Sequence, residues 1–239
     1  MAEIRDMDID VVVFDVLGTL VDEPGGLRTA IRDAVSAPDD ASGGAAETSV
    51  DELLLLWQRH IEDEQRRIAH GQRPYAGSEV LDREAAQRVA DQAGIGDPAA
   101  VARLAAAGSR LPPWGDSVAG LERMARLRPV IGLSNAGRTA LLRLSAYAGL
   151  RWHQALSGEA VRAYKPAPEV YRLAADTAGC PPERVLMVAA HAWDLRAAQA
   201  VGMRTAYVRR PVGDPPADSD SFDGSFDGLD DLAAALTAR

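Results

Sequence analysis

The sequence predicts an α/β fold with a Rossmann-like parallel sheet core, helices on both faces of the sheet, and an inserted helical cap. A β-branched and aromatic run over residues 11–14 reads as a buried strand that ends at Asp15. After residue 111, apolar strands alternate with helices, as in βαβ units. Between these regions there is no strand pattern. The predicted core is residues 1–22 and 112–239, and the predicted cap is residues 23–111.

The predicted cap contains helices with recognisable start signals. Pro24 and the two glycines after it interrupt the apolar pattern, and residues 37–48 read as a polar loop. Ser49 and Glu52 form a capping box, in which each side chain can bond the backbone N–H of the other residue. The expected cap helices are residues 27–35, 50–70 and 79–93, with a further helix that starts at Asp97 and Pro98.

The predicted core shows the alternation of a parallel sheet. The expected strands after the first one are residues 129–133, 154–156, 184–189 and 204–209. The expected helices are residues 118–127, 140–148, 168–178, 195–200 and 229–237. Residues 214–228 read as a solvated loop, because Asp223 stands where a calcium loop that starts at Asp218 requires glycine. No metal site is predicted.

Composition excludes several classes of function. The net charge of -9 argues against a nucleic-acid-binding surface. One cysteine, Cys180, cannot form an internal disulfide framework and suits a reducing compartment. The first ten residues lack the apolar run of a signal peptide, and no stretch is long enough to cross a bilayer. We therefore expect a cytoplasmic protein without nucleic-acid or membrane partners.

Polar side chains follow four of the predicted strands. They are Asp15 with Thr19, Ser134 with Asn135, Tyr164 with Lys165, and His191 with Asp194. Because the carboxyl ends of parallel strands meet at one edge of a sheet, we expect these groups to converge. An aspartate held ionised by a lysine is a candidate nucleophile. Taken singly, Lys165 would also suit a surface salt bridge, and the Ser134–Asn135 pair a helix N-cap.

The order of these motifs resembles the haloacid dehalogenase superfamily. FDVLGT, LSN, YKP and a strand that leads to Asp194 stand in the family's order, and they span residues 15–194. The helical insertion occupies the position of the family's cap. The resemblance therefore implies a Rossmann-like hydrolase whose nucleophile is Asp15.

Two departures indicate the branch of the superfamily. Phosphatase members carry a second aspartate two residues after the nucleophile, where this chain has Leu17. They also carry a magnesium ligand at the position of Ala190. A halide leaves as a stable anion, so breaking a carbon–halogen bond needs neither a general acid nor a metal. The sequence is thus similar to the metal-independent type II (S)-2-haloacid dehalogenases, and the Gly18–Thr19 pair, Tyr171 and the Ala192–Trp193–Asp194 run also match that branch.

That resemblance implies a mechanism. Asp15 would attack the halogen-bearing carbon with inversion, and water would then hydrolyse the aspartyl ester. Lys165 and Asp194 would form an ion pair that orients Asp15, while Ser134 and Asn135 would bind the substrate carboxylate. The implied substrate is a small anionic 2-haloacid, and no cofactor is implied. A homodimer is compatible with the resemblance, because similar dehalogenases often pair.

Three other positions differ from that branch. Ala189 and His191 stand where the family has a serine and an asparagine near the water. His191 could act as a hydrogen-bond partner or general base, or simply pack beside Trp193. The family's Trp-Arg pair in the cap reads Trp57–Gln58, and Arg59 follows one place later. Adjacent helical residues point about 100° apart, so whether Gln58 or Arg59 enters the pocket stays open.

Two alternatives to a dehalogenase remain at this point. One is a phosphatase of the same superfamily with degraded motifs. The other is a member without catalytic activity that binds a small anion or a protein partner through the cap. They differ from the first hypothesis in their response to phosphate esters, magnesium and haloacids.

Overall fold

A parallel sheet lies at the centre of the protein, whose computed structural model describes residue 4, residues 7–36 and residues 48–237. The strand order is β3-β2-β1-β4-β5-β6, and every neighbouring pair is parallel. The strands are β1 (Val11–Asp15), β2 (Val130–Ser134), β3 (Gln154–Ser157), β4 (Val185–Ala189), β5 (Arg204–Val208) and β6 (Gly224–Phe226). The predicted fold class is confirmed.

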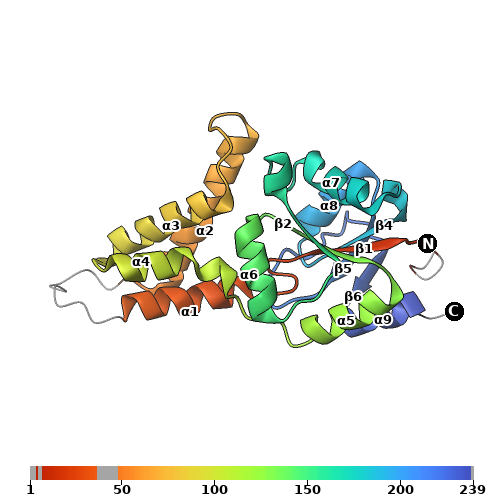
Figure 1. Cartoon of the computed structure of the whole chain (residues 1–239), viewed down its shortest axis with the longest axis horizontal. Helices are drawn as coiled ribbons and strands as arrows, with labels where there is room; N and C mark the ends of the chain where they lie inside the picture. The colour runs from red at the N-terminus through yellow and green to blue at the C-terminus, as the bar shows by residue number, and fades with distance from the viewer. Residues whose placement is uncertain (1–3, 5–6, 37–47, 238–239) are drawn as a thin grey trace.

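Helices cover both faces of the sheet, which explains why β1 is apolar along its whole length. Alternate residues of β1 enter two different cores: Val12 and Phe14 pack in one, Val11 and Val13 in the other. The first core includes side chains of α5 (Ser117–Leu127), α6 (Arg138–Ala148) and α9 (Leu229–Thr237). The second includes α7 (Pro168–Ala178) and α8 (Ala192–Val201), which lie on the opposite side of the sheet (Figure 1).

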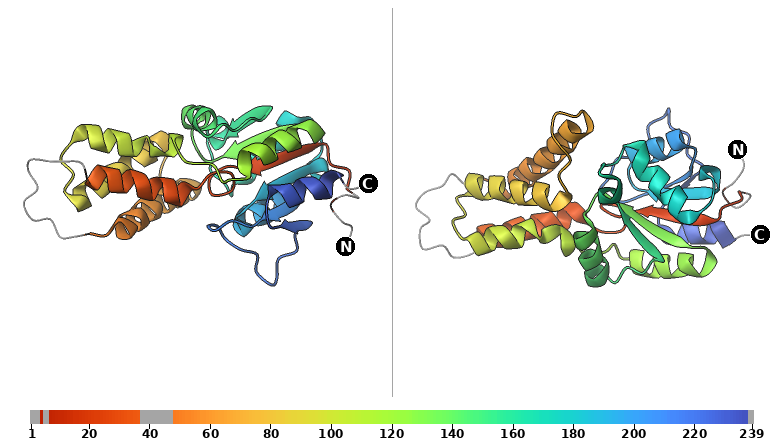
Figure 2. Two further views of the ribbon diagram at one scale, coloured as in Figure 1. Left: turned by 90° about the horizontal axis from the view of Figure 1, so that it is seen from below. Right: turned by 45° about the horizontal axis from the view of Figure 1, so that its top comes forward.

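The inserted helices lie together beside the end of the sheet where β1 leads toward α1 (Figures 1 and 2). They are α1 (Glu23–Val35), α2 (Val50–Ala69), α3 (Ser78–Ala93), α4 (Pro98–Ala105) and the short 3-10 helix η2 (Ala107–Ser109). The capping box is confirmed: Ser49 Oγ accepts from Glu52 N at 3.2 Å, and Ser49 N donates to Glu52 Oε2 at 2.9 Å. The exact division into residues 1–22 with 112–239 and residues 23–111 stays a prediction.

Three local predictions need correction, and each has a physical reason. Helix α1 begins at Glu23, before the expected residue 27, because Asp22 caps it by accepting from Gly25 N at 2.9 Å and proline is tolerated in a first turn. Helix α8 begins at Ala192, which places Asp194 in its first turn. The predicted loop over residues 214–228 contains the short edge strand β6. The predicted loop over residues 37–48 lies outside the described residues, apart from residue 48.

The acidic tail is tied to the core by its own side chains. Asp220 pairs with Arg196 at 2.7 Å, and Asp223 accepts from Thr205 N at 2.8 Å. Within the described ranges, no three His, Cys, Asp or Glu side chains are grouped as a metal site. Among the same described residues, no helix is both long enough and apolar enough to cross a membrane.

Close packing of α5 against α9 gives a test of this arrangement. A Cβ added at Gly120 would lie 2.5 Å from Leu229 Cβ. An alanine normally stabilises a helix relative to glycine by about 1 kcal/mol. Here we expect Gly120→Ala to lower the free energy of unfolding by about 1–3 kcal/mol, because the contact overpacks the core. Urea unfolding would measure this difference.

The matched control is Gly115→Ala, because an added Cβ there meets nothing within 4 Å. We expect this variant to lie within about 0.5 kcal/mol of the wild type. A Gly120→Ala protein as stable as the Gly115→Ala control would contradict the described packing of α5 on α9.

Candidate active site

A buried lysine joins the ends of β1 and α8. Lys165 Nζ lies 2.9 Å from Asp15 Oδ1 and 2.8 Å from Asp194 Oδ2. Lys165 is only 4% exposed, and Asp194 is fully buried. Asp15 is the last residue of β1, and Lys165 precedes α7, so parallel packing brings residues 150 positions apart into one ion cluster.

The charges in this cluster support one another. Burial disfavours the Lys165 ammonium, but the negative charges of Asp15 and Asp194 outweigh burial and hold its pKa above the ordinary value. Burial raises the pKa of Asp194, and the charge of Lys165 opposes that rise. Tyr171 donates a hydrogen bond to Asp194 Oδ1, so both oxygens of this carboxylate accept. Burial also raises the pKa of Tyr171, which keeps its hydroxyl a donor.

The second oxygen of Asp15 is held as well. Thr19 Oγ1 donates to Asp15 Oδ2 at 2.6 Å and accepts from Ala190 N at 2.9 Å. The carboxylate therefore has one donor on each oxygen, which fixes its orientation. Such a carboxylate is preorganised as a nucleophile.

Asp15 opens into a cavity of about 390 Å³ between the sheet and the cap helices. Leu17 and Lys165 line it beside Asp15, and Trp57 and Gln58 line it from α2. Leu17 stands two residues after the nucleophile and offers no proton. The site is thus suited to attack on a substrate whose leaving group departs without protonation.

Comparison with known proteins agrees with this geometry. The sequence model of the haloacid dehalogenase-like hydrolase family matches residues 9–202. The chain belongs to the haloacid dehalogenase-like hydrolases. The (S)-2-haloacid dehalogenase of Xanthobacter autotrophicus is 31% identical over 206 residues, which cover 84% of this chain and 76% of that protein. The (S)-2-haloacid dehalogenase 4A of Burkholderia cepacia is 29% identical over 85% of this chain and 84% of its own.

Solved structures agree with the sequence relatives. The crystal structure of a defluorinating L-2-haloacid dehalogenase superposes with a TM-score of 0.85 and 32% identity, covering 96% of each chain. Both the fold and the order of the motifs are therefore those of this hydrolase family.

Of the two residues predicted to bind the substrate carboxylate, Asn135 lines the cavity of this hydrolase and Ser134 does not. Asn135 lines the cavity, and its Oδ1 accepts from Lys165 N at 2.8 Å, which leaves the amide nitrogen to donate to a ligand. Ser134 is fully buried and is not part of the cavity wall; its Oγ accepts from Ala136 N at 3.1 Å. Contact between Ser134 and substrate stays a prediction, as does contact with Thr19 or Tyr171.

The structure separates the two cap residues that the sequence left open. Gln58 lines the cavity, whereas Arg59 is exposed and absent from the cavity wall. Trp57 is 3% exposed and forms part of the same wall. Among the described residues that line the cavity, Lys165 is the one lysine or arginine, and both of its contacts are made to carboxylates.

His191 lies over the turn that follows β1. Its Nε2 is 3.3 Å from the carbonyl oxygen of Leu17, so Nε2 is the protonated nitrogen when they bond and Nδ1 is then an acceptor. A Cβ at Gly18 would lie 2.5 Å from this Nε2, and Gly18 has φ +77, so glycine serves both the turn and the close approach. The ring also stacks beside Trp193, with centroids 5.8 Å apart. His191 both packs against Trp193 and lines the cavity.

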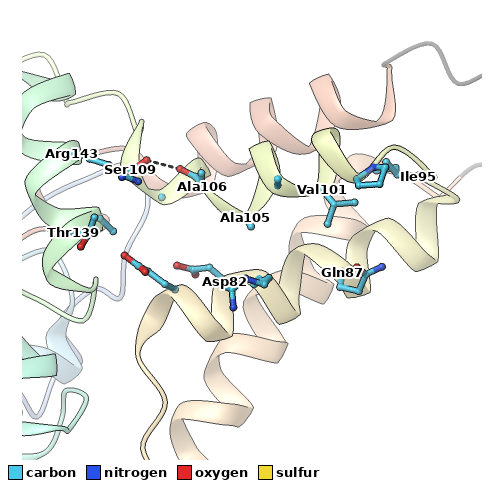
Figure 3. A pocket seen from close by; sticks show the side chains of 16 residues that line it. Asp82, Gln87, Ile95, Val101, Ala105, Ala106, Ser109, Thr139 and Arg143 are labelled. Atoms are coloured by element: carbon cyan, nitrogen blue, oxygen red, sulfur yellow. Dashed lines mark hydrogen bonds between the residues drawn. The ribbon is translucent and has the colours of Figure 1, made fainter.

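Four acidic residues in the cavity wall escaped the sequence analysis: Glu23 in α1, Glu62 in α2, Asp82 in α3 and Asp214 after β5. Glu23 was missed because the sequence around Pro24 was interpreted as a break between elements. Asp82 was missed because an acidic residue on a helix is usually exposed to solvent. Asp82 also lines a second cavity of about 640 Å³ between α3, α4 and α6. Figure 3 shows Asp82 in that cavity, with Thr139 and Arg143 on the α6 side.

The hydrogen bond from Tyr171 to Asp194 gives a test of the ion cluster. We expect Tyr171→Phe to lower the free energy of unfolding by about 1–3 kcal/mol, because a buried acceptor loses its donor. Tyr147→Phe is the control, because Tyr147 is 55% exposed. Chemical denaturation of both variants would measure the difference, and equal stability of the two would show that the Tyr171 bond contributes nothing.

Proposed function

We propose that this protein is a metal-independent hydrolytic dehalogenase of short 2-haloacids that works through an aspartyl ester on Asp15. The observation that carries the proposal is the carboxylate of Asp15, fixed by Lys165 and Thr19 beside a cavity in which Leu17 supplies no general acid. The activities named for the sequence relatives support the same reaction.

The first step is a displacement at carbon. An oxygen of Asp15 attacks the halogen-bearing carbon from the side opposite the halogen, the new C–O bond forms, and the halide leaves with the bonding electron pair. No proton is needed, because halide is a weak base. The amide nitrogens of Asn135 and Gln58 are among the neutral donors in the cavity wall that can bind anionic groups of the substrate or the departing halide.

The second step is hydrolysis of the ester. Water attacks the carboxyl carbon of Asp15, a base takes one proton of the water, and the released alkoxide is protonated to give the 2-hydroxy acid. The Nδ1 of His191 is the candidate base, since Nε2 faces the Leu17 carbonyl oxygen. Lys165 and Thr19 then hold the regenerated carboxylate of Asp15.

The ester predicts a specific isotope result. With enzyme in excess over (S)-2-chloropropionate in H₂¹⁸O, we expect ¹⁸O in the Asp15 carboxyl group and ¹⁶O in the first product, because water attacks the carboxyl carbon. Mass spectrometry of the peptide that contains Asp15 would detect the label, with chloride release measured in parallel. Asp15→Asn should release no chloride.

Other outcomes would favour the alternatives. Absence of halide release from (S)-2-chloropropionate and fluoroacetate by folded protein would overturn the proposal. Magnesium-dependent turnover of p-nitrophenyl phosphate would instead support a phosphatase, and anion binding without any turnover would support a binding protein.

Because Gln58 lines the cavity, a positive charge at this position should strengthen the binding of an anionic substrate. We expect Gln58→Arg to lower KM for (S)-2-chloropropionate about tenfold, because a charge-assisted hydrogen bond is worth about 1.5–3 kcal/mol. Arg59→Ala is the matched control and should leave KM unchanged, since Arg59 is exposed outside the cavity. Steady-state kinetics would measure both, and a raised KM in Arg59→Ala alone would contradict the assignment of Gln58.

A further inference from the structure

The side chain of Glu23 lines the active-site cavity and has no hydrogen-bond partner among the described residues. It lies in the first turn of α1, eight residues after Asp15, and it lines the same cavity. The interactions that act on it are burial and the charges of His191 and Asp15, with no hydrogen bond to a described residue. Its carboxyl group is therefore free to bond a ligand.

The charges around the cavity disfavour a further anion. The acidic residues of its wall are Asp15 from β1, Glu23 from α1, Glu62 from α2, Asp82 from α3, and Asp214 from the loop after β5. The basic groups of the described wall are Lys165, which already pairs with Asp15 and Asp194, and His191. A carboxylate substrate would therefore meet net negative charge, which a neutral acid in the wall would reduce.

Glu23 and Asp82 are the acids of the wall whose surroundings favour the neutral form. Burial raises the pKa of Glu23 to about 7, the charge of His191 opposes the rise, and the charge of Asp15 adds to it. Burial likewise raises the pKa of Asp82 to about 7, with further contributions from the charges of Glu23 and Glu79. Near neutral pH these carboxyl groups can hold a proton that an ordinary glutamate or aspartate would release.

We propose that Glu23 determines specificity for an anionic substrate by donating a hydrogen bond to the haloacid carboxylate as a neutral carboxyl, so that binding takes up a proton. This inference rests on the proposed function, since it assigns the substrate contact of the same site. Gln58 supplies a second neutral donor from α2. Together, Glu23 and Gln58 supply neutral hydrogen-bond donors in a cavity that has Gln58 at the position of the family's cap arginine.

The sign of the pH dependence follows from linkage. An anion bound beside Glu23 raises the pKa of this carboxyl still further, so the complex holds the proton more tightly than the free protein does. Below about pH 7 Glu23 is already protonated, and affinity is at its maximum. Above that pH each binding event must take up a proton, so affinity falls by up to about tenfold per pH unit.

Calorimetry with propionate tests this without any need for turnover. Propionate carries the carboxylate of the substrate and has no halogen, so its binding can be measured even if the proposed dehalogenation fails. For the wild type we expect affinity to fall between pH 7 and pH 9, with proton uptake revealed by buffers of different ionisation enthalpy. Glu23→Gln keeps a neutral donor at every pH, so its affinity should fall less than that of the wild type over this range and should be the higher of the two at pH 9.

Three controls separate Glu23 from its neighbours. Glu62→Gln removes one acid from the rim of the same cavity, where Glu62 is exposed, and should keep the wild-type pH dependence. Asp82→Asn removes the other wall carboxyl whose pKa burial raises to about 7, and His191→Asn removes the imidazole from the same wall. A pH dependence that is as steep in Glu23→Gln as in the wild type, and that disappears in Asp82→Asn or His191→Asn, would overturn the proposal.

A different ligand class gives the opposite result. Ionised Glu23 and Asp82 would attract a cation, so tighter binding of propylammonium than of propionate, lost in Glu23→Gln, would also overturn the proposal.

Thermal unfolding gives an independent readout. Because the pKa of Glu23 is raised in the folded state, its ionisation destabilises the native state as pH rises from about 4.5 to about 7. Glu23→Gln should therefore gain in Tm over the wild type at pH 8 more than at pH 4.5, and equal gains would contradict the proton-favouring environment.

Discussion

The buried ammonium of Lys165 is the interaction on which the rest of the structure depends. It is 4% exposed and bridges Asp15 at the end of β1 to Asp194 in the first turn of α8. Removing one partner of a buried ion pair leaves an unpaired charge, which typically destabilises a protein by about 3–5 kcal/mol. The strand, the loop before α7 and α8 must therefore keep their positions together, so the same contacts serve folding and chemistry.

Much of the fold could be predicted because its signals are local. The apolar run of β1, the alternation after residue 111 and the capping box at Ser49 each have a direct physical meaning, and the structure contains all three. The errors arose where a tertiary contact decides the outcome. Strand β6 has three residues and forms because β5 offers an edge, and α1 starts early because Asp22 caps a turn that contains proline.

The residues of the candidate site also divide into those that the sequence could predict and those that depend on tertiary contacts. Asp15, Lys165 and Asp194 follow strands or loops whose places are determined by sheet topology, so their convergence could be expected from the order of motifs. The choice between Gln58 and Arg59 depends on the rotation of one helix against the core, which sequence spacing leaves open. Glu23 and Asp82 carry no sequence signal, because an acid in a helix looks the same whether it faces solvent or a cavity.

The proposed reaction moves one negative charge rather than creating one. In the first step the charge of Asp15 passes to the halide, and Lys165 keeps only Asp194 as an ionised partner. The ion cluster therefore favours the carboxylate over the ester, and stabilisation of the departing halide must come from the other side of the cavity, where the wall has neutral donors such as Gln58. In the second step the charge returns to Asp15, between Lys165 and Thr19, which already stand at hydrogen-bond distance. The buried cluster thus favours ester hydrolysis, and the cap must favour ester formation.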